Sequence, residues 1–310
     1  MIPREQFVPA TITTLHTIDP GEIRSVTLTL PSEWDLEGQR LPIRDTMRPG
    51  NAFLARPLGS RTGKLRRRMY SRSNCAVNTP LELETIINHT HEAKADSSIW
   101  WQTDDALALH RSAGTVDVRV SLAPDGSHLT IHENSATCEP SNLRLEPDGT
   151  WEGMRVVAIA LSTGLTPFLA HVRYMAAHHF GRAPGQAGAH VVLIVSVRRP
   201  AQLMAHEELL ALQRQFPEHF TYYPVLTREW PADWPYGTGR IIQTSGKGNH
   251  CTGGQEGAGP AVNVAPLLAV VPDLPDRHLR YCGNASGRTQ LQDGLRQKGI
   301  ASLSFRTEVW

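Results

Sequence analysis

The sequence lacks any apolar run that approaches the ~20 residues needed for a membrane-spanning helix. We therefore expect no membrane span. Its first residues, Met1 to Val8, include Arg4 and Glu5 but no apolar core of the kind a secretory signal requires. These two absences lead us to expect a cytoplasmic protein.

Cysteines are few and scattered, at Cys75, Cys138, Cys251 and Cys282, and no two form a C-x-x-C pair. This spacing argues against a zinc site and against a cysteine-ligated iron–sulfur cluster. A disulfide framework is not expected in a long chain without a secretory signal. The 14 histidines do not complete a ligand set, so no metal site is predicted. If the protein handles electrons, it needs a bound organic cofactor.

An excess of either charge is also absent, because 31 Lys and Arg face 30 Asp and Glu, for a net charge of +1. Nothing in this balance draws the chain to nucleic acid. One segment differs, since it gathers basic residues without an acid among them: Arg56, Arg61, Lys64, Arg66, Arg67, Arg68 and Arg72. This cluster is either a solvated basic loop or an anion site combined with a docking face for an acidic partner.

The first half of the sequence alternates apolar and polar residues with period two. Short runs of this kind are Ser25–Leu30, Leu81–Ile87, Thr115–Leu122 and the pair Leu129 and Ile131. Turn signals such as Asp19-Pro20-Gly21 separate them. This pattern is typical of an antiparallel β-sandwich or β-barrel.

The second half changes to continuous apolar runs, which predict strands covered on both faces. The runs are 156–161, 191–195, 220–226 and 279–282, and they alternate with helical patterns from 165, at 202–216 and at 289–298. Strand–helix alternation predicts an α/β domain with a parallel sheet. We therefore expect two domains, 1–150 and 151–310. The Gly-rich stretch from Thr244 to Val264 is expected to be a mobile surface loop, and a lid role for it stays open.

Four motifs follow one another along the chain. They are Arg68-Met69-Tyr70-Ser71, then Ser162-Thr163-Gly164-Leu165-Thr166-Pro167, then Val197-Arg198-Arg199-Pro200, and then Tyr281-Cys282-Gly283-Asn284 with a chain end of Glu308-Val309-Trp310. In this order and spacing the chain resembles the ferredoxin–NADP reductase superfamily over nearly its whole length. The resemblance implies an N-terminal flavin-binding antiparallel β-barrel followed by a C-terminal nucleotide-binding α/β domain.

The resemblance assigns the flavin to the first motif. It implies that Tyr70 packs on the isoalloxazine ring, that Arg68 pairs with the pyrophosphate and that Ser71 hydrogen-bonds near the hydride-accepting nitrogen. These roles suit a flat aromatic face and a guanidinium fork. Asn74 stands where relatives often carry a second serine.

A second phosphate contact is implied at Ser98, at a helix N-terminus in Asp96-Ser97-Ser98-Ile99-Trp100-Trp101. The alternative reading of this segment is a capped helix with two core tryptophans.

The resemblance assigns the pyrophosphate of the nicotinamide dinucleotide to Thr163, Gly164 and Thr166. Backbone donors and the helix dipole face an anion at such a strand–helix turn. Relatives usually begin this motif with glycine, and Ser162 departs from that pattern.

Arg198 and Arg199 follow the second buried strand, where this fold meets the ribose that carries a 2′-phosphate in NADP. Two arginines favour that phosphate, so NADP(H) is preferred over NAD(H). Ala205 stands where NADP-selective relatives often carry a tyrosine.

The last motif concerns the nicotinamide. The resemblance implies that Cys282 and Gly283 lie beside its ring; the alternative reading of Cys282 is a small buried apolar residue. Ala285 stands where relatives often have proline. Glu308 is implied to relay a proton to or from the flavin, and Trp310 to shield the flavin face. A final strand that packs Trp310 on the core is the alternative.

Together these features imply a flavoprotein oxidoreductase that moves electrons between NADPH and a one-electron carrier, ferredoxin or flavodoxin, through bound FAD rather than FMN. The carrier would dock near Arg61–Arg72. Two rivals stay open: a reductase component of a dedicated oxygenase, and a non-catalytic flavin- or nucleotide-binding interaction protein on the same scaffold.

Overall fold

The computed structural model describes residues 6–57, 66–89, 100, 115–131, 154–181, 188–244 and 262–309. The chain forms two compact units: Met1–Trp151 with Leu165–Pro184, and Glu152–Gly164 with Gly185–Trp310. A boundary between residues 150 and 151 lies outside the described residues.

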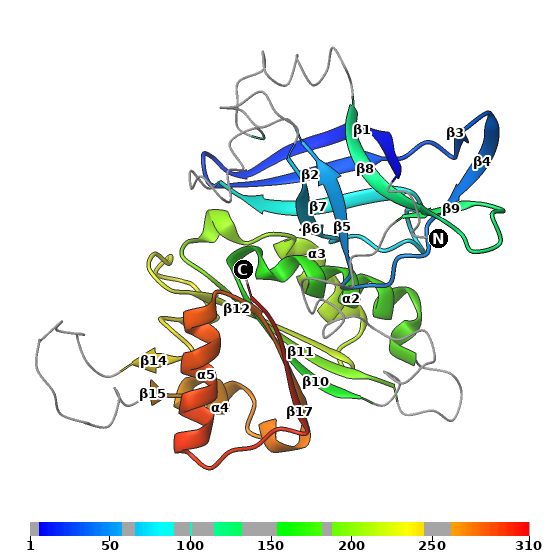
Figure 1. Ribbon diagram of the computed structural model, residues 1–310. Helices are drawn as coiled ribbons and strands as arrows, with labels where there is room; N and C mark the ends of the chain where they lie inside the picture. The colour runs from blue at the N-terminus through cyan, green and yellow to red at the C-terminus, as the bar shows by residue number, and fades with distance from the viewer. Residues whose placement is uncertain are drawn as a thin grey trace, which may run out of the picture. The chain divides into compact units, whose positions relative to one another are not determined.

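The first unit is built on a curled sheet, seen in blue to green in Figure 1. Its strands are β1 (Gln6–Asp19), β2 (Ile23–Thr29), β3 (Glu33–Leu36), β4 (Gln39–Arg44), β5 (Ala52–Arg56), β6 (Arg68–Ser71), β7 (Glu82–Asn88), β8 (Thr115–Leu122) and β9 (Leu129–Ile131). They are ordered β3-β4-β9-β8-β1-β2-β7, with β5 joining β6 to β8. All pairs are antiparallel except β4 with β9.

The period-two pattern explains the core of this unit. In β8, Val116, Val118 and Val120 are buried while the residues between them are partly exposed. These valines join Phe53 and Trp100 in one apolar cluster. One face of the curled sheet is therefore buried in an apolar core, as the alternation predicts.

The first unit also contains α2 (Leu165–Ala177) and the short helix η4 (His179–Gly181). Arg173 of α2 forms an ion pair with Glu84 of β7 at 3.2 Å and donates a hydrogen bond to the carbonyl of Ser73. The Ser73 hydroxyl donates to Glu84 as well. This polar cluster ties α2 to the strands near the first motif.

The second unit contains a parallel sheet. Its strands are β10 (Arg155–Leu161), β11 (His190–Val197), β12 (Phe220–Leu226), β13 (Gly237–Thr238), β16 (His278–Gly283) and β17 (Ser304–Val309). The order is β13-β12-β11-β10-β16-β17, and every pair is parallel. A separate pair, β14 (Gln243–Thr244) and β15 (Val262–Asn263), is antiparallel.

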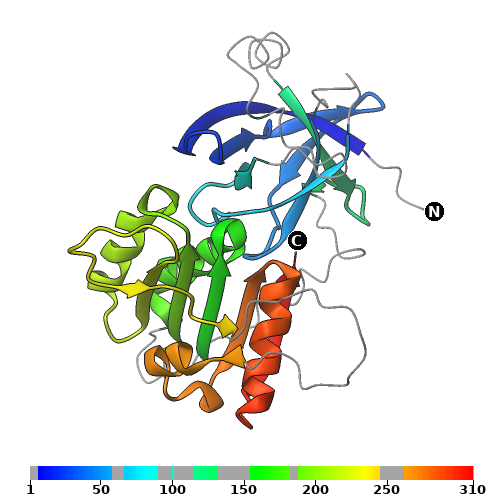
Figure 2. The ribbon, with the colours of Figure 1, turned by 90° about the vertical axis from the view of Figure 1, so that its left-hand side faces the viewer.

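Helices flank this sheet. They are the turn η3 (Ser162–Gly164), η5 (Pro200–Gln202), α3 (His206–Gln215), α4 (Ala265–Val270), η6 (Leu274–Asp276) and α5 (Ala285–Gln297). Leu267 of α4 and Leu291 of α5 share an apolar cluster with Ile159 of β10. Figures 1 and 2 both show α5 running along that face. On the other face, Tyr222 of β12 hydrogen-bonds with His206 of α3.

The expected fold class, an antiparallel β unit followed by a parallel α/β unit, is confirmed. Two helix boundaries differ from the sequence prediction. The expected helix at 202–216 is divided, because Ala205 has a left-handed backbone (φ 52°) between η5 and α3. The last helix starts at Ala285 rather than at residue 289, since the side chain of Asn284 accepts a hydrogen bond from the backbone N–H of Gly287 and caps it. Gly299 follows that helix with φ 65°, as a C-terminal glycine should.

Within the described ranges, no helix is long and apolar enough to cross a membrane. The same residues include no group of three or more His, Cys, Asp or Glu side chains that could hold a metal ion.

Candidate functional site

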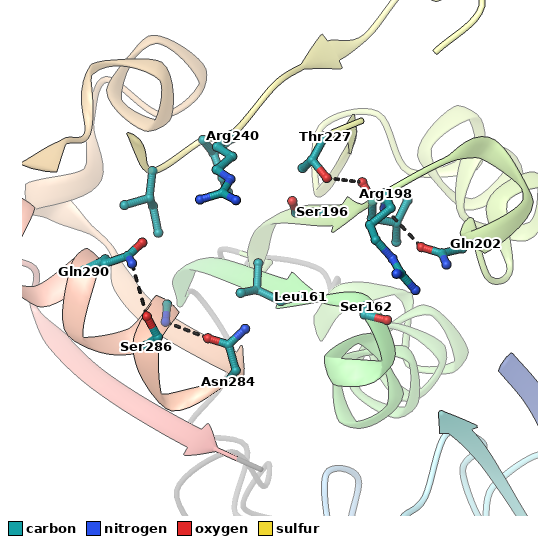
Figure 3. A pocket seen from close by; sticks show the side chains of 14 residues that line it. Leu161, Ser162, Ser196, Arg198, Gln202, Thr227, Arg240, Asn284, Ser286 and Gln290 are labelled. Carbon is teal, nitrogen blue, oxygen red and sulfur yellow. Dashed lines mark hydrogen bonds between the residues drawn. The ribbon is translucent and has the colours of Figure 1, made fainter. Parts of the chain in front are cut away.

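The carboxyl ends of the parallel strands surround a cavity of about 420 Å³. The chain runs from β10 outward to β12 on one side and returns to β16 on the other, so the strand order reverses beside β10. Ligands of open α/β sheets bind at such a reversal. The cavity is lined by Leu161, Ser162, Ser196, Val197, Arg198, Gln202, Thr227, Arg240, Ile241, Ile242, Asn284, Ser286, Gly287 and Gln290 (Figure 3).

The polar lining is basic or neutral. Arg198 and Arg240 are its charged side chains, and no Asp or Glu lines it. The N-terminal end of α5, capped by Asn284, forms another part of the wall. A helix N-terminus and two guanidinium groups favour an anion. The arrangement suits a phosphate-bearing ligand.

Arg198 and Arg199 differ in position. Arg198 lines the cavity, and its backbone N–H donates to the side-chain oxygen of the buried Gln202 at 3.1 Å. Arg199 caps η5 and does not line the cavity. The structure thus brings only the first of the two arginines to this site.

The turn after β10 is close to the end of β16. A Cβ atom added to Gly164 would lie 2.2 Å from the carbonyl oxygen of Cys282, so only glycine fits there. Ser162 has φ 51°, a left-handed backbone that glycine adopts more readily than serine does. Thr163 is half-exposed beside them, and Thr166 is buried in the first turn of α2.

Cys282 is the next-to-last residue of β16, is buried, and lies directly opposite Glu308 of β17 in the parallel register. Burial, with a smaller contribution from the negative charge of Glu308, raises the pKa of the Cys282 thiol well above its usual value. The thiol therefore stays protonated. A Cβ atom at Gly283 would lie 2.8 Å from the Tyr281 hydroxyl, which explains the second glycine near this end of the sheet.

The first motif forms β6 of the first unit. Arg68 and Tyr70 are two residues apart, so their side chains share one face of this strand. Tyr70 packs near Phe53 and Trp100 and accepts a 3.1 Å hydrogen bond from the Trp100 indole. Burial raises the pKa of Tyr70 to about 12. Its ring remains neutral and presents a flat, largely apolar surface.

The Arg68 side chain has one unsatisfied hydrogen-bond donor in the described part of the chain. One terminal nitrogen, Nη2, is buried and has no hydrogen-bond partner among the described residues, while Nη1 donates to the Arg67 carbonyl. Leaving a buried charged donor unpaired costs about 1–3 kcal/mol or more. A phosphate held against β6 would satisfy this group. Ser71, the last residue of β6, is half-buried and pairs in register with Ala52.

The basic cluster is only partly what its sequence suggests. Arg72 is buried and forms an ion pair with Asp45 at 2.9 Å, so it cannot present charge to a partner. Arg56 is paired with Asp117 at 2.6 Å. The expected docking face Arg61–Arg72 is therefore wrong at Arg72, because the charge of this residue is buried and paired. The sequence pattern did not reveal the two pairs, because Asp45 and Asp117 are distant from the basic cluster in the sequence. Residues 58–65 lie outside the described residues, which leaves Arg67 as an exposed member of the cluster.

The Asn74 side chain is buried and has a structural role. Its side chain accepts from Arg72 and donates to Thr79, inside the same buried network. Of the remaining expected site residues, Ser98 and Trp310 lie outside the described residues, as does the Gly-rich stretch from 245 to 261. Trp100 is described and is a core residue of the first unit.

Sequence reasoning missed Arg240, Asn284, Ser286 and Gln290 as cavity residues. Arg240 follows a glycine in a loop without any motif, so no local signal marks it. Asn284 and the two α5 residues could have been found if the helix had been predicted to start at Ala285, with Asn284 as its N-cap.

Residues 159–258 match the family model described as the oxidoreductase NAD-binding domain. No curated protein sequence matches the chain. Among solved structures, a cytochrome P450 reductase from Amycolatopsis is similar, with 17% identity and a TM-score of 0.62, over 100% of this chain and 71% of that one.

Two ferredoxin–NADP⁺ reductases are also similar. The one from Plasmodium falciparum, solved with 2′-phospho-AMP, has 13% identity and a TM-score of 0.59, over 100% and 99% of the two chains. The one from Neisseria gonorrhoeae, solved with FAD and NADP, has 14% identity and a TM-score of 0.54, over 95% and 92%. These likenesses show that the chain shares the fold of these reductases, which is the fold that the resemblance implied.

Proposed function

We propose that this chain, which has the two-domain fold of the ferredoxin–NADP reductase-like flavoprotein reductases, oxidises NADPH through bound FAD and delivers single electrons to a ferredoxin or flavodoxin. The observation that carries the proposal is the cavity at the strand reversal, where Arg198, Arg240 and the N-terminus of α5 meet without a carboxylate. The domain division 1–150 for the flavin and 151–310 for the nucleotide is part of the proposal.

Residues of the first unit suit the flavin. The unpartnered Nη2 of Arg68 would bind a pyrophosphate oxygen, and the neutral face of Tyr70 would pack on the ring. Ser71 would hydrogen-bond the ring edge, and Ser98 and Trp310 keep the roles that the resemblance implies. When bound, the flavin supplies the conversion between a two-electron hydride and single electrons.

Residues of the second unit suit the dinucleotide. Thr163, Gly164 and the first turn of α2, with Thr166, would hold the pyrophosphate by backbone N–H groups. Arg198 would bind the ribose 2′-phosphate, with Arg199 supporting the positive field behind it. The absence of a carboxylate from the cavity lining favours NADPH over NADH, because an acid there would repel the phosphate.

Cys282 and Glu308 would act next to the nicotinamide. Because its pKa is raised, the Cys282 thiol stays neutral and offers a small polarisable contact instead of a negative charge. Gly283 leaves room beside it. Glu308 is the register partner of Cys282 in the β16–β17 pair, and it would hold or release a proton there.

An anaerobic titration tests the proposal. The purified protein should be yellow, and NADPH should bleach the flavin absorption at a lower concentration than NADH. The reduced protein should then reduce a ferredoxin or flavodoxin in one-electron steps. A colourless protein that does not bind added FAD would instead support the interaction-protein alternative.

A second candidate is a reductase component of one oxygenase system. The observation that favours it is the likeness to the Amycolatopsis cytochrome P450 reductase and to a ferredoxin reductase of carbazole 1,9a-dioxygenase, the latter at 14% identity and a TM-score of 0.57. Rapid flavin reduction combined with slow transfer to every free ferredoxin and flavodoxin tried would favour this reading.

A further inference from the structure

Arg240 is a second arginine in the cavity lining, and it belongs to none of the four sequence motifs. It lies between β13 and β14 and follows Gly239, whose φ of 76° turns the chain. The N–H of Gly239 donates to the carbonyl of Leu226 at 2.8 Å, and Ile241 and Ile242 after it are buried. Its backbone is thus fixed on both sides, although its side chain is exposed.

The opposite wall is fixed as well. The Arg198 N–H is bound by Gln202, which is 1% exposed, and the Arg198 carbonyl accepts from the N–H groups of Arg228 and Glu229. Figure 3 shows Arg240 and Arg198 entering from different elements, with Ser196 between them. The Thr227 hydroxyl is directed to the Val197 carbonyl, so it closes this wall.

No Asp or Glu is among the residues that line the cavity. Within the described part of the chain, no hydrogen bond or ion pair holds the Arg240 side chain. Two like charges in the lining of one cavity both attract an anion, and an anion between them lowers their mutual repulsion. A doubly charged phosphate monoester balances two guanidinium charges better than a singly charged phosphate diester does. In a dinucleotide, the 2′-phosphate is the monoester and the pyrophosphate is not.

We propose that Arg240 is a specificity-determining residue, which clamps the ribose 2′-phosphate of NADP(H) against Arg198. This inference rests on the proposed function and deepens it. The backbone N–H groups of the turn Ser162–Gly164 would offer the pyrophosphate a separate site. Arg198, at the end of the second strand, marks the ribose end of the ligand. Arg240 therefore acts on the 2′-phosphate and not on the rest of the nucleotide.

Calorimetric titration of the flavin-loaded protein with two probes tests this inference. The probes are adenosine 2′,5′-bisphosphate and 5′-AMP, which differ only in the 2′-phosphate. Arg240→Gln should weaken the bisphosphate about 10- to 100-fold, as the loss of a charge-assisted contact implies. Binding of 5′-AMP should change less than about twofold. Arg240→Lys should recover part of the loss, because it keeps the charge without the fork.

The matched control is Arg228→Gln, which removes the same charge from an exposed arginine near the same strand ends but outside the cavity lining. It should leave both affinities and the rate of NADH oxidation unchanged. Equal weakening of both probes by Arg240→Gln, or no weakening of either, would overturn the clamp. If the wild-type protein prefers 5′-AMP and NADH, the clamp fails while the reductase function stands. If NADPH and NADH both leave the flavin oxidised, the proposed function itself fails.

Discussion

Individual residues in this protein keep backbone conformations that their side chains disfavour. Ala205 adopts φ 52° and ψ 27° directly before α3, and it provides no side-chain cap for the helix. A left-handed conformation costs a residue with a Cβ atom roughly 1–2 kcal/mol. Alanine is also among the poorest N-cap residues. The position is therefore a local weakness in the second unit.

Ala205→Gly should raise the free energy of unfolding by about 1 kcal/mol, because glycine adopts this backbone without strain and caps helices better than alanine. Urea denaturation of the two proteins would measure the difference. Ala201→Gly is the matched control: Ala201 lies in η5 without a positive φ, so glycine should lower stability there. A loss of stability in Ala205→Gly would contradict the argument.

Arg72 shows why a residue's role cannot be read from its neighbours in sequence. It stands in a run of basic residues, which suggests an exposed face. In the fold, Asp45 and the carbonyls of Thr79 and Glu82 surround it. A buried guanidinium needs such partners, and they come from positions that no local pattern connects.

Among the elements, β10 and β16 of the parallel sheet are connected at their amino-terminal ends by one acid, Asp273. Asp273 precedes η6 and accepts from the side chains of Arg155, at the start of β10, and Arg277, just before β16. Hydrogen bonding to Arg277 is the main cause that lowers the pKa of Asp273 below its usual value. The Arg277 side chain is 6% exposed, so it depends on this acid.

Asp273→Asn should lower the free energy of unfolding by about 1–3 kcal/mol at pH 7, since it leaves a buried arginine without its counter-ion. The folded-state pKa of Asp273 is lowered, so its contribution is complete above the unfolded value near 4. That contribution disappears as pH falls through the folded-state pKa. Thermal melts of both proteins should therefore differ at pH 7 and converge at the most acidic pH values.

Asp276→Asn is the control for this comparison, because Asp276 is an exposed acid in the same short helix. It should change stability little at any pH. A gap between wild type and Asp273→Asn that stays constant down to pH 3 would show that charge is not the cause.

For the whole molecule, the opposing charges nearly cancel, so any attraction to a carrier must come from local surfaces. Arg67 is exposed in the first unit and adjoins the segment assigned to the flavin, whereas Arg72 and Arg56 are neutralised by Asp45 and Asp117. An acidic carrier would be steered by the exposed charges, and salt screens such steering within ~10 Å at 0.1 M ionic strength.

Raising ionic strength should slow electron transfer to the carrier several-fold more than it slows reduction of the flavin by NADPH, as measured by stopped-flow absorbance. Arg67→Gln should weaken the salt dependence of the carrier step. Arg214→Gln, an exposed arginine on α3 of the second unit, should not. Equal salt sensitivity of the two steps would reject a docking face in the basic cluster.

The sequence by itself determined the two-unit plan and most strands, because the period of apolar residues follows directly from which faces of a sheet are covered. Thr115–Leu122 and Phe220–Leu226 were predicted with the bounds that the structure has. Motif order likewise placed Arg198 at the end of the second parallel strand. These features depend on residues close together in the chain.

Only the tertiary structure decided which of those residues share a site. It separated Arg198 from Arg199, buried Arg72 beside Asp45, and brought Arg240 to a cavity with Gln290 of α5 and Asn284, the residue that caps this helix. Parallel strands gather their carboxyl ends at one edge whatever their separation in sequence. The charge and shape of the cavity are therefore properties of the folded sheet, and no single segment carries them.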